Sequence, residues 1–230
     1  AGFDYPIIIS FTSADENLSI QVHPTDEYAI THENALYGKS ESWYFIEPPS
    51  EGWIYADSLI EDKREIKRSI LNGDYESVVG KIIVSKDDVV YIPSGTLHAL
   101  TRGSLVYEIQ QSTDITYRFF DYNRLDNDGK LRDLHLDDAI ETLNTENRVK
   151  SSAFPKDTLV SDQPYTMVRK TLENVYHNTT DVAVAITVSK GSMCVYCHRI
   201  LAGMSILVLP DEAISISQAA EEVVIAPPKL

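Results

Sequence analysis

The chain has 230 residues, of which 43% are hydrophobic, so one large or two small domains can bury a substantial core. Its 35 acidic residues outnumber its 20 basic ones, and the net charge of -15 disfavours nucleic acid and anionic membranes as partners. The sequence shows no long apolar run and no signal-peptide pattern, and its 2 cysteines fit a reducing compartment, so we expect a cytoplasmic protein.

Short segments rich in β-branched and aromatic residues, separated by turn residues, recur along the chain. Many short strands with polar residues between them predict a mainly β fold of the sandwich or barrel type. The predicted strands cover residues 5–12, 18–23, 43–46, 81–85, 89–92, 104–110, 182–188, 193–201, 205–209 and 223–226.

Two helical patterns interrupt the strands. The first begins at Ser58, which forms a capping-box pattern with Glu61, and continues at helical spacing to a stop at Gly73. The second runs from Leu136 to Leu143. We expect the first helix to cover one face of the β structure.

A polar stretch without a clear period follows the second helix, and we place a domain boundary there. The predicted organisation is a first domain at 1–143 with a helical excursion at about 58–79, a linker at 144–163, and a second domain at 164–230.

Four potential metal ligands occur in three separate segments of the first domain. In the segment 18–23, strand alternation places Gln21 and His23 on one face and the apolar residues on the other. His98 follows a tight Pro/Gly turn at the start of another strand, and Glu41 precedes an aromatic strand. Two nitrogen and two oxygen ligands suit zinc or a neighbouring first-row metal. A single histidine on a strand is nevertheless more often a hydrogen-bonded residue than a ligand.

Four motifs, LSIQVHP, GKSESWYFI, YIPSGTLHAL and LVYEIQQSTDITYRFFDYNRLDNDGKLRDLH, occur between Tyr5 and Leu143. In order and spacing this region resembles type I mannose-6-phosphate isomerase in its short bacterial form, a family of the cupin superfamily. The resemblance implies two cupin (jelly-roll) β-barrels with a few short helices. It also implies one zinc ion, or another first-row metal, held in the first barrel by Gln21, His23, Glu41 and His98.

The resemblance further implies an isomerase that interconverts mannose 6-phosphate and fructose 6-phosphate. Glu108, Arg118 and Lys39 match the family's active-site glutamate, arginine and lysine, and which of them moves the proton stays open. Arg124 and Ser19 fall where the family is thought to hold the phosphate group. The implied partner is therefore a small sugar phosphate.

The chain begins close to the first motif, whereas family members carry a substantial segment before it. We therefore expect sheet edges that the C-terminal half, a domain-swapped neighbour or a homodimer would cover. Two alternative functions remain: a truncated homologue that binds metal and sugar phosphate without turnover, as a sensor or interaction module, and another cupin enzyme such as a metal oxygenase. Oxygenase sites usually use more histidines.

Cys194, Cys197 and His198 form a C-x-x-C-H pattern, which is typical of c-type haem attachment. The pattern lies in an apolar run that we predict to be one strand, where residues three apart face opposite sides of the sheet. We therefore do not expect haem or zinc at this pattern. Because no histidine follows the cupin-like loop with Gly203 and Pro210, we expect the second barrel to be free of metal.

Overall fold

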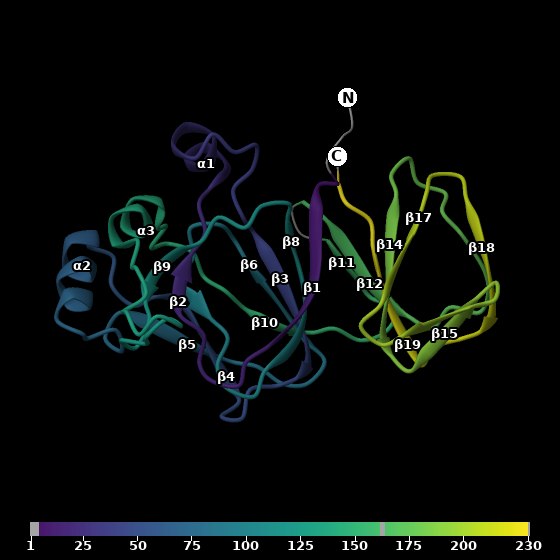
Figure 1. Ribbon diagram of the computed structural model, residues 1–230, viewed down its shortest axis with the longest axis horizontal. Coiled ribbons are helices and arrows are strands. Elements are labelled where there is room, and N and C mark those ends of the chain that lie inside the picture. The colour runs from purple at the N-terminus through teal and green to yellow at the C-terminus, as the bar shows by residue number, and fades with distance from the viewer. Residues whose placement is uncertain (1–4, 162–163, 230) are drawn as a thin grey trace. The chain divides into compact units, whose positions relative to one another are not determined.

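The structure is a computed structural model that describes residues 5–161 and 164–229, and it is mainly β (Figure 1). The chain divides into two compact units, Ala1–Ala153 and Phe154–Leu230. The segment 144–163 expected to be a linker spans this division. Its described part includes two short strands, β10 (Ser151–Ala153) and β11 (Leu159–Ser161).

Unit 1 contains two antiparallel sheets in its described residues, with strand orders β1-β8-β3-β6-β10 and β5-β4-β7-β2-β9. The strands of the first sheet are β1 (Ile7–Ser13), β8 (Leu105–Gln111), β3 (Glu41–Glu47), β6 (Asp88–Ile92) and β10. Those of the second sheet are β5 (Val79–Ile83), β4 (Trp53–Ser58), β7 (His98–Ala99), β2 (Ile20–Val22) and β9 (Tyr117–Phe120).

The inner faces of the two sheets meet in one buried apolar cluster, which includes Trp43, Phe45 and Val90 from the first sheet and Ile54 from the second. Because side chains alternate along a strand, Glu41 lies on the same face of β3 as Trp43 and Phe45. The space between the sheets is thus apolar along much of β3 and becomes polar at the start of that strand.

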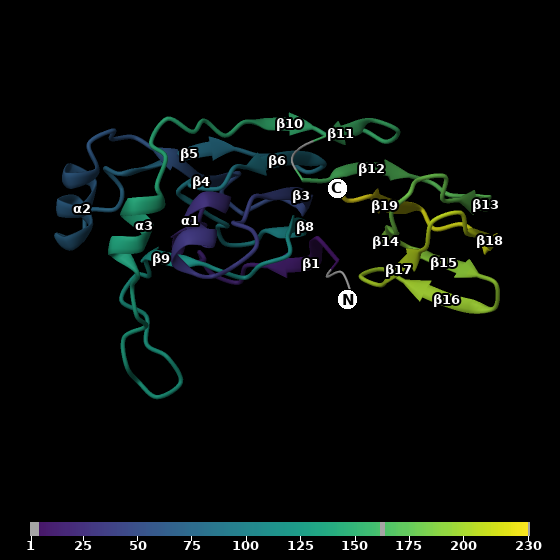
Figure 2. The ribbon, with the colours of Figure 1, turned by 90° about the horizontal axis from the view of Figure 1, so that it is seen from above.

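The helices of unit 1 are α1 (Asp26–His32), α2 (Lys63–Leu71) and α3 (Leu136–Thr142). Ile66 and Ile70 of α2 and Ala139 of α3 share a second buried cluster with Val22 and Phe119 of the second sheet. Figure 2 shows α3 next to β9, with α2 on the outer side of α3. In the described residues, no helix has the length and apolar content needed to cross a membrane.

The first helix begins later than the sequence suggested, and the proposed capping residue was wrong. Asp62 is the N-cap of α2, and its carboxylate accepts a hydrogen bond from the Arg64 N–H at 2.8 Å. Ser58 instead ends β4, and its hydroxyl donates to the carbonyl of Ile60 at 2.6 Å. The second helical prediction was confirmed by α3.

Unit 2 contains two further sheets in its described residues, with strand orders β11-β12-β19-β14-β17 and β13-β18-β15-β16. Its buried core includes Ile186 and Val188 from the first of these sheets and Met193 and Ile216 from the second. Apart from β11, the strands are β12 (Thr166–Lys170), β13 (Asn174–His177), β14 (Val184–Lys190), β15 (Ser192–Val195), β16 (His198–Leu201), β17 (Ser205–Val208), β18 (Ala213–Gln218) and β19 (Glu222–Ala226).

The single strand predicted across residues 193–201 was wrong, because this segment forms a hairpin. Cys194 lies in β15, Cys197 lies in the exposed turn and His198 begins β16. Tyr196 in the turn has a φ of 53°, a conformation that tight hairpin turns require. The three residues of the C-x-x-C-H pattern are therefore distributed over a turn and two strands, and strand alternation cannot decide which way they face.

Candidate metal centre

Adjacent strands of the second sheet bring residues from distant segments side by side. In the register of this sheet, Gln21 of β2 pairs with His98 of β7 on one side and with Arg118 of β9 on the other. His23 lies two residues beyond Gln21, and Glu41 at the start of β3 reaches the group from the facing sheet. The structure thus brings together all four residues that the resemblance implied as ligands.

Two glycines allow the backbone to approach this site closely. A Cβ on Gly38 would lie 2.2 Å from the carbonyl oxygen of Pro24, so the chain that leads to Glu41 can pass this close to the His23 segment only as glycine. Gly95 has a φ of +78°, and its N–H donates to the carbonyl of His23 at 2.8 Å. This bond ties the turn before His98 to the other histidine.

The four side chains form a compact group. The ligand atoms of His23, Glu41 and His98 all lie within 4.8 Å of one another. His23 Nε2 lies 3.4 Å from Glu41 Oε2, and His98 Nε2 lies 3.2 Å from Glu41 Oε1. The Gln21 amide is 3.4 Å and 3.3 Å from the two Nε2 atoms. His23, Glu41 and His98 are each only 1% exposed.

The outer nitrogen of each imidazole faces a backbone carbonyl. His23 Nδ1 lies 3.0 Å from the oxygen of Ile115, and His98 Nδ1 lies 2.8 Å from that of Thr96. Because a carbonyl accepts hydrogen bonds, this arrangement favours the proton on Nδ1 and a lone pair on Nε2. Both lone pairs then point toward the Glu41 carboxylate.

The group therefore consists mostly of acceptors that face one another. Within the described residues, both carboxylate oxygens of Glu41 are buried and accept no hydrogen bond of good geometry. A buried carboxylate without donors is costly, whereas a cation among two imidazoles, a carboxylate and an amide oxygen would satisfy all of them. Exchanging the two amide atoms of Gln21 would turn its oxygen toward the group. The residues present fit a divalent metal ion.

Electrostatics keep these ligands in their metal-binding forms. Burial, followed by the charge of Lys39, lowers the pKa of His23 to about 4, so the imidazole is neutral at pH 7. Burial alone would raise the pKa of Glu41. The Lys39 ammonium, 3.2 Å from its Oε2, and the contacts with His23 and His98 outweigh that effect and hold the pKa well below its usual range.

A second carboxylate lies next to this group. Glu108 faces Trp43 across the β3–β8 pair, and its Oε1 is 3.8 Å from Lys39 Nζ. Thr12 of β1 donates a hydrogen bond to Glu108 Oε2 at 2.9 Å. Burial, and then the nearby Glu41 charge, raise the pKa of Glu108 to about 7, although Lys39 and Thr12 oppose the shift. Glu108 can therefore gain or lose a proton near neutral pH.

Arg118 of β9 pairs with Gln21 of β2 and therefore lies beside the metal-type group, the name used here for Gln21, His23, Glu41 and His98. Its Nη1 donates to the carbonyl oxygen of Asp133 at 2.7 Å. Among the described residues, its buried Nε has no partner. The guanidinium is thus anchored at one nitrogen and keeps another donor free.

The two predicted phosphate residues lie just outside the strands that carry Gln21 and Arg118: Ser19 precedes β2 and Arg124 follows β9. Ser19 is half-buried and precedes Gln21 by two residues. Arg124 follows β9, and its guanidinium forms an ion pair with Asp121 and donates to the carbonyl of Asn17 at 2.9 Å. Asp121 also pairs with Arg132 at 2.6 Å. Much of the hydrogen-bonding capacity of Arg124 is therefore already used within the chain.

Three residues that support the site were missed in the sequence. Thr12 orients Glu108, Gly38 makes the close approach described above, and Asn147 donates to Thr96 Oγ1 at 2.7 Å in the turn before His98. Thr12 and Asn147 are polar residues in ordinary surroundings, so no local pattern marks them. The glycine immediately before Lys39 was a usable signal.

Fold and site together define a mainly β protein whose first unit carries a buried two-histidine, one-glutamate group suited to a divalent metal. A comparison with models of known protein families found no match. Curated proteins do match: the chain is homologous to mannose-6-phosphate isomerases. It is 42% identical over 142 residues to ManA of Bacillus subtilis, a mannose-6-phosphate isomerase, covering 62% of this chain and 45% of ManA.

It is also 41% identical over 139 residues to the probable mannose-6-phosphate isomerase GmuF of the same organism, covering 60% of this chain and 44% of GmuF. The matches thus span less than half the length of these relatives. The crystal structure of the mannose 6-phosphate isomerase from Bacillus subtilis superposes with a TM-score of 0.80 at 27% identity, covering 99% of this chain and 76% of that one. A putative mannosephosphate isomerase from Archaeoglobus fulgidus has the same fold, with a TM-score of 0.74 at 17% identity, covering 99% of this chain and 73% of that one.

Proposed function

We propose that the chain carries the metal-dependent aldose–ketose isomerase activity that interconverts mannose 6-phosphate and fructose 6-phosphate. The observation that carries this proposal is the buried His23, Glu41 and His98 group, next to Glu108 and Arg118, in a homologue of mannose-6-phosphate isomerases. Two buried imidazoles and a carboxylate within reach of one another can hold a divalent cation, and zinc suits this ligand set.

The proposal includes the finer features that the resemblance implied. Each unit is taken to be a cupin barrel, with the metal in the first and none in the second. The domain limits of 1–143 and 164–230, with a linker at 144–163, remain part of this proposal. So do a cytoplasmic location and a sugar phosphate as the small-molecule partner. A homodimer is the proposed assembly that covers exposed sheet edges.

Isomerisation requires one proton to move between C1 and C2 of the open-chain sugar. Glu108 is the proposed base, because a pKa of about 7 lets its carboxyl accept that proton and return it near neutral pH. Lys39 lies between Glu41 and Glu108, and its ammonium favours the charged form of both carboxylates. Thr12 holds the Glu108 carboxylate through Oε2 and leaves Oε1 to face Lys39.

Arg118 is proposed to stabilise the negative charge that develops on the substrate oxygens. Its free Nε and its position next to Gln21 place a donor beside the metal-type group. A divalent cation held by Gln21, His23, Glu41 and His98 would supply a Lewis acid for the same oxygens. The phosphate end would extend from this group toward Ser19 and Arg124.

The test is a coupled isomerase assay on the zinc-loaded chain with mannose 6-phosphate as substrate. We expect turnover in the wild type and losses of at least about 100-fold in Arg118→Ala, which removes a transition-state donor, and in His98→Ala. His177→Ala and Arg64→Ala, both at exposed positions, are the matched controls and should retain activity.

Absence of turnover in the loaded wild type would contradict the isomerase proposal. If such protein still bound mannose 6-phosphate, the chain would be a non-catalytic sugar phosphate binder. Full activity in His98→Ala would show that the metal-type group is not part of the reaction.

A further inference from the structure

The segment 38–40 leads to the start of β3 and is fixed by a hydrogen bond at each of its three amides. The first N–H donates to Asp26 Oδ1 at 2.8 Å, and the second donates to the carbonyl of Pro24 at 3.0 Å. The third donates to Gln111 Oε1 at 2.8 Å. Two of these acceptors are side chains, so the path of the segment depends on residues outside the metal-type group.

Gln111 connects the two side-chain acceptors. Its Oε1 also accepts from the Ser40 hydroxyl at 3.0 Å, and its Nε2 donates to Asp26 Oδ1 at 3.0 Å. Because the amide oxygen faces donors and the amide nitrogen faces a carboxylate, these contacts fit only one orientation of the amide. Asp26, Ser40 and Gln111 together form a hydrogen-bond clamp on the segment.

The clamp joins three elements of unit 1. Asp26 is the first residue of α1, Ser40 directly precedes β3, and Gln111 is the last residue of β8. Ser40 and Gln111 are 5% and 8% exposed, so water competes little for their hydrogen bonds. Removing the Gln111 amide would take away the acceptor of a buried N–H, which is costly. The chain can therefore leave this path only by giving up buried hydrogen bonds.

The clamped segment carries the cation of the proposed reaction. Lys39 Nζ lies 3.2 Å from Glu41 Oε2 and 3.8 Å from Glu108 Oε1. A lysine side chain is long and flexible and acts as a point charge, so the position of its ammonium depends on how firmly its backbone is held. A shift of the segment would change both distances. It would also move the Glu41 carboxylate relative to the two imidazoles.

We infer that Asp26 and Gln111 are positioning residues of the isomerase reaction, which hold the Lys39 ammonium and the Glu41 carboxylate in place through the segment 38–40. The inference rests on the proposed function and adds two residues that do not touch the reacting atoms. A misplacement of about 1 Å can cost a reaction about 100-fold. Groups that orient metal ligands contribute about 10- to 100-fold to metal affinity or activity.

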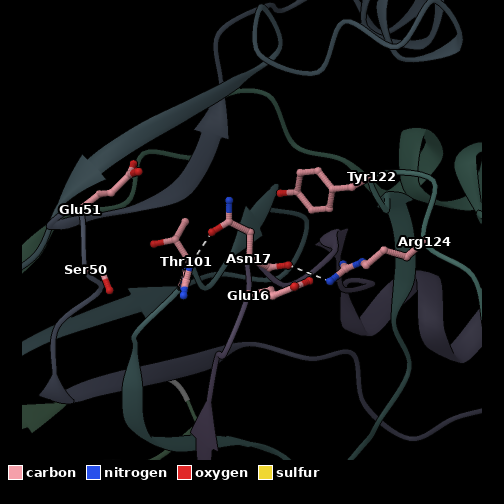
Figure 3. A pocket seen from close by; sticks show the side chains of 8 residues that line it. Glu16, Asn17, Ser50, Glu51, Thr101, Tyr122 and Arg124 are labelled. Carbon is pink, nitrogen blue, oxygen red and sulfur yellow. Dashed lines mark hydrogen bonds between the residues drawn. The ribbon is translucent and has the colours of Figure 1, made fainter.

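The clamp is not part of the pocket that Arg124 lines, toward which the phosphate end of the substrate is proposed to extend. Figure 3 shows this pocket, whose lining also includes Asn17 and Tyr122. In the described part of the chain, neither Asp26 nor Gln111 belongs to that lining. Variants of the clamp should therefore lower kcat and leave KM nearly unchanged.

The experiment measures kcat and KM of the full chain at saturating zinc with mannose 6-phosphate, and zinc affinity by equilibrium titration. Gln111→Leu removes all three hydrogen bonds of the side chain. It should lower kcat and zinc affinity by about 10- to 100-fold. Asp26→Ala should lower both by about tenfold, since it leaves the bonds between Gln111 and Ser40 intact.

Two further variants separate the hydrogen bonds from other effects. Both bonds to Asp26 end on Oδ1, so Asp26→Asn offers an oxygen to the same donors and should keep the wild-type kcat and zinc affinity. Glu27→Ala removes the neighbouring exposed carboxylate from the same turn of α1. It is the matched control and should behave like the wild type.

Wild-type kcat and zinc affinity in Gln111→Leu would overturn the inference, even with a lowered unfolding midpoint, because a purely structural role gives that result. Equal losses in Asp26→Asn and Asp26→Ala, or a similar loss in Glu27→Ala, would also overturn it. If the wild type lacks turnover, the isomerase proposal fails and the zinc titration still decides the inference. If the wild type turns over and the clamp variants match it, the isomerase proposal stands and the inference fails.

Discussion

Glu222 in unit 2 and Glu41 in unit 1 are both buried in a β core, and the two glutamates differ in how they are satisfied. In unit 2, Glu222 is 4% exposed and its carboxylate accepts from Arg169 at 2.6 Å and from Ser189 at 2.8 Å. In unit 1, Glu41 is 1% exposed, yet neither of its oxygens accepts a hydrogen bond of good geometry from the described residues. The first is a complete structural ion pair, whereas the second faces the Lys39 ammonium at 3.2 Å and two imidazole nitrogens, an arrangement suited to a metal ion.

The largest expected effect concerns metal affinity. Glu41→Gln keeps the shape of the side chain but removes the charge that faces both imidazoles. Zinc affinity should therefore fall by more than about 100-fold, because residues that only orient a metal ligand already cost about 10- to 100-fold. The metal-free variant should also be less stable than the wild type, because it loses the buried ion pair between Glu41 and Lys39. Equilibrium zinc titration and urea unfolding measure the two quantities.

The control is Glu47→Gln, at the exposed end of the same strand, where the carboxylate pairs with Lys86 at 2.8 Å. It should leave zinc affinity unchanged. Unchanged zinc affinity in Glu41→Gln would contradict the proposal that Glu41, unlike Glu222, is a metal ligand.

The next effect is on stability. Glu222→Gln removes the buried carboxylate that pairs with Arg169 and should destabilise unit 2 by about 3–5 kcal/mol, with no change in zinc affinity. The neighbouring variant Glu221→Gln is the matched control, since that exposed carboxylate pairs with Lys190 and should contribute at most about 1 kcal/mol. Similar unfolding midpoints for the two variants would show that the buried pair is not a structural element.

The smallest effect is a pH dependence in unit 1. The pKa of Glu108 is raised from 4.5 to about 7, so its neutral form is favoured in the folded state. The metal-free wild type should then lose stability as the pH rises from about 4.5 to 7, on the order of 2 kcal/mol, whereas Glu108→Gln should not show this loss.

Denaturant unfolding of metal-free wild type and Glu108→Gln at pH 5 and pH 8 measures this difference. The stability advantage of the variant should grow with pH. Parallel pH profiles for the two proteins would contradict the raised pKa.

Sequence reasoning predicted the β class and the α3 helix, because alternation and helical spacing are local patterns. It missed α1, β4 and β9, which are short or flanked by polar residues, and it mistook Ser58 for a cap that Asp62 provides. In the C-x-x-C-H segment it overlooked a two-residue turn, since no glycine or proline marks it.

For the site, residue type and strand alternation marked Gln21, His23, Glu41 and His98 as potential ligands. Only the resemblance joined them in one metal site. The resemblance also supplied Arg124 as a phosphate residue, without its contacts in the chain. Ion pairing of Arg124 with Asp121 depends on a turn that no periodicity describes. Residue type alone cannot tell a committed guanidinium from a free one.

Local patterns in the chain determined the β class, many of the strands and which side chains have the chemistry to bind a metal, because alternation and residue type act over a few neighbours. Contacts between residues distant along the chain bring Gln21, His23, Glu41 and His98 together and raise the pKa of Glu108. Strand register, burial and the charges around a side chain are set only when the two sheets pack face to face. These quantities distinguish a carboxylate in a structural ion pair from one that can bind a metal ion.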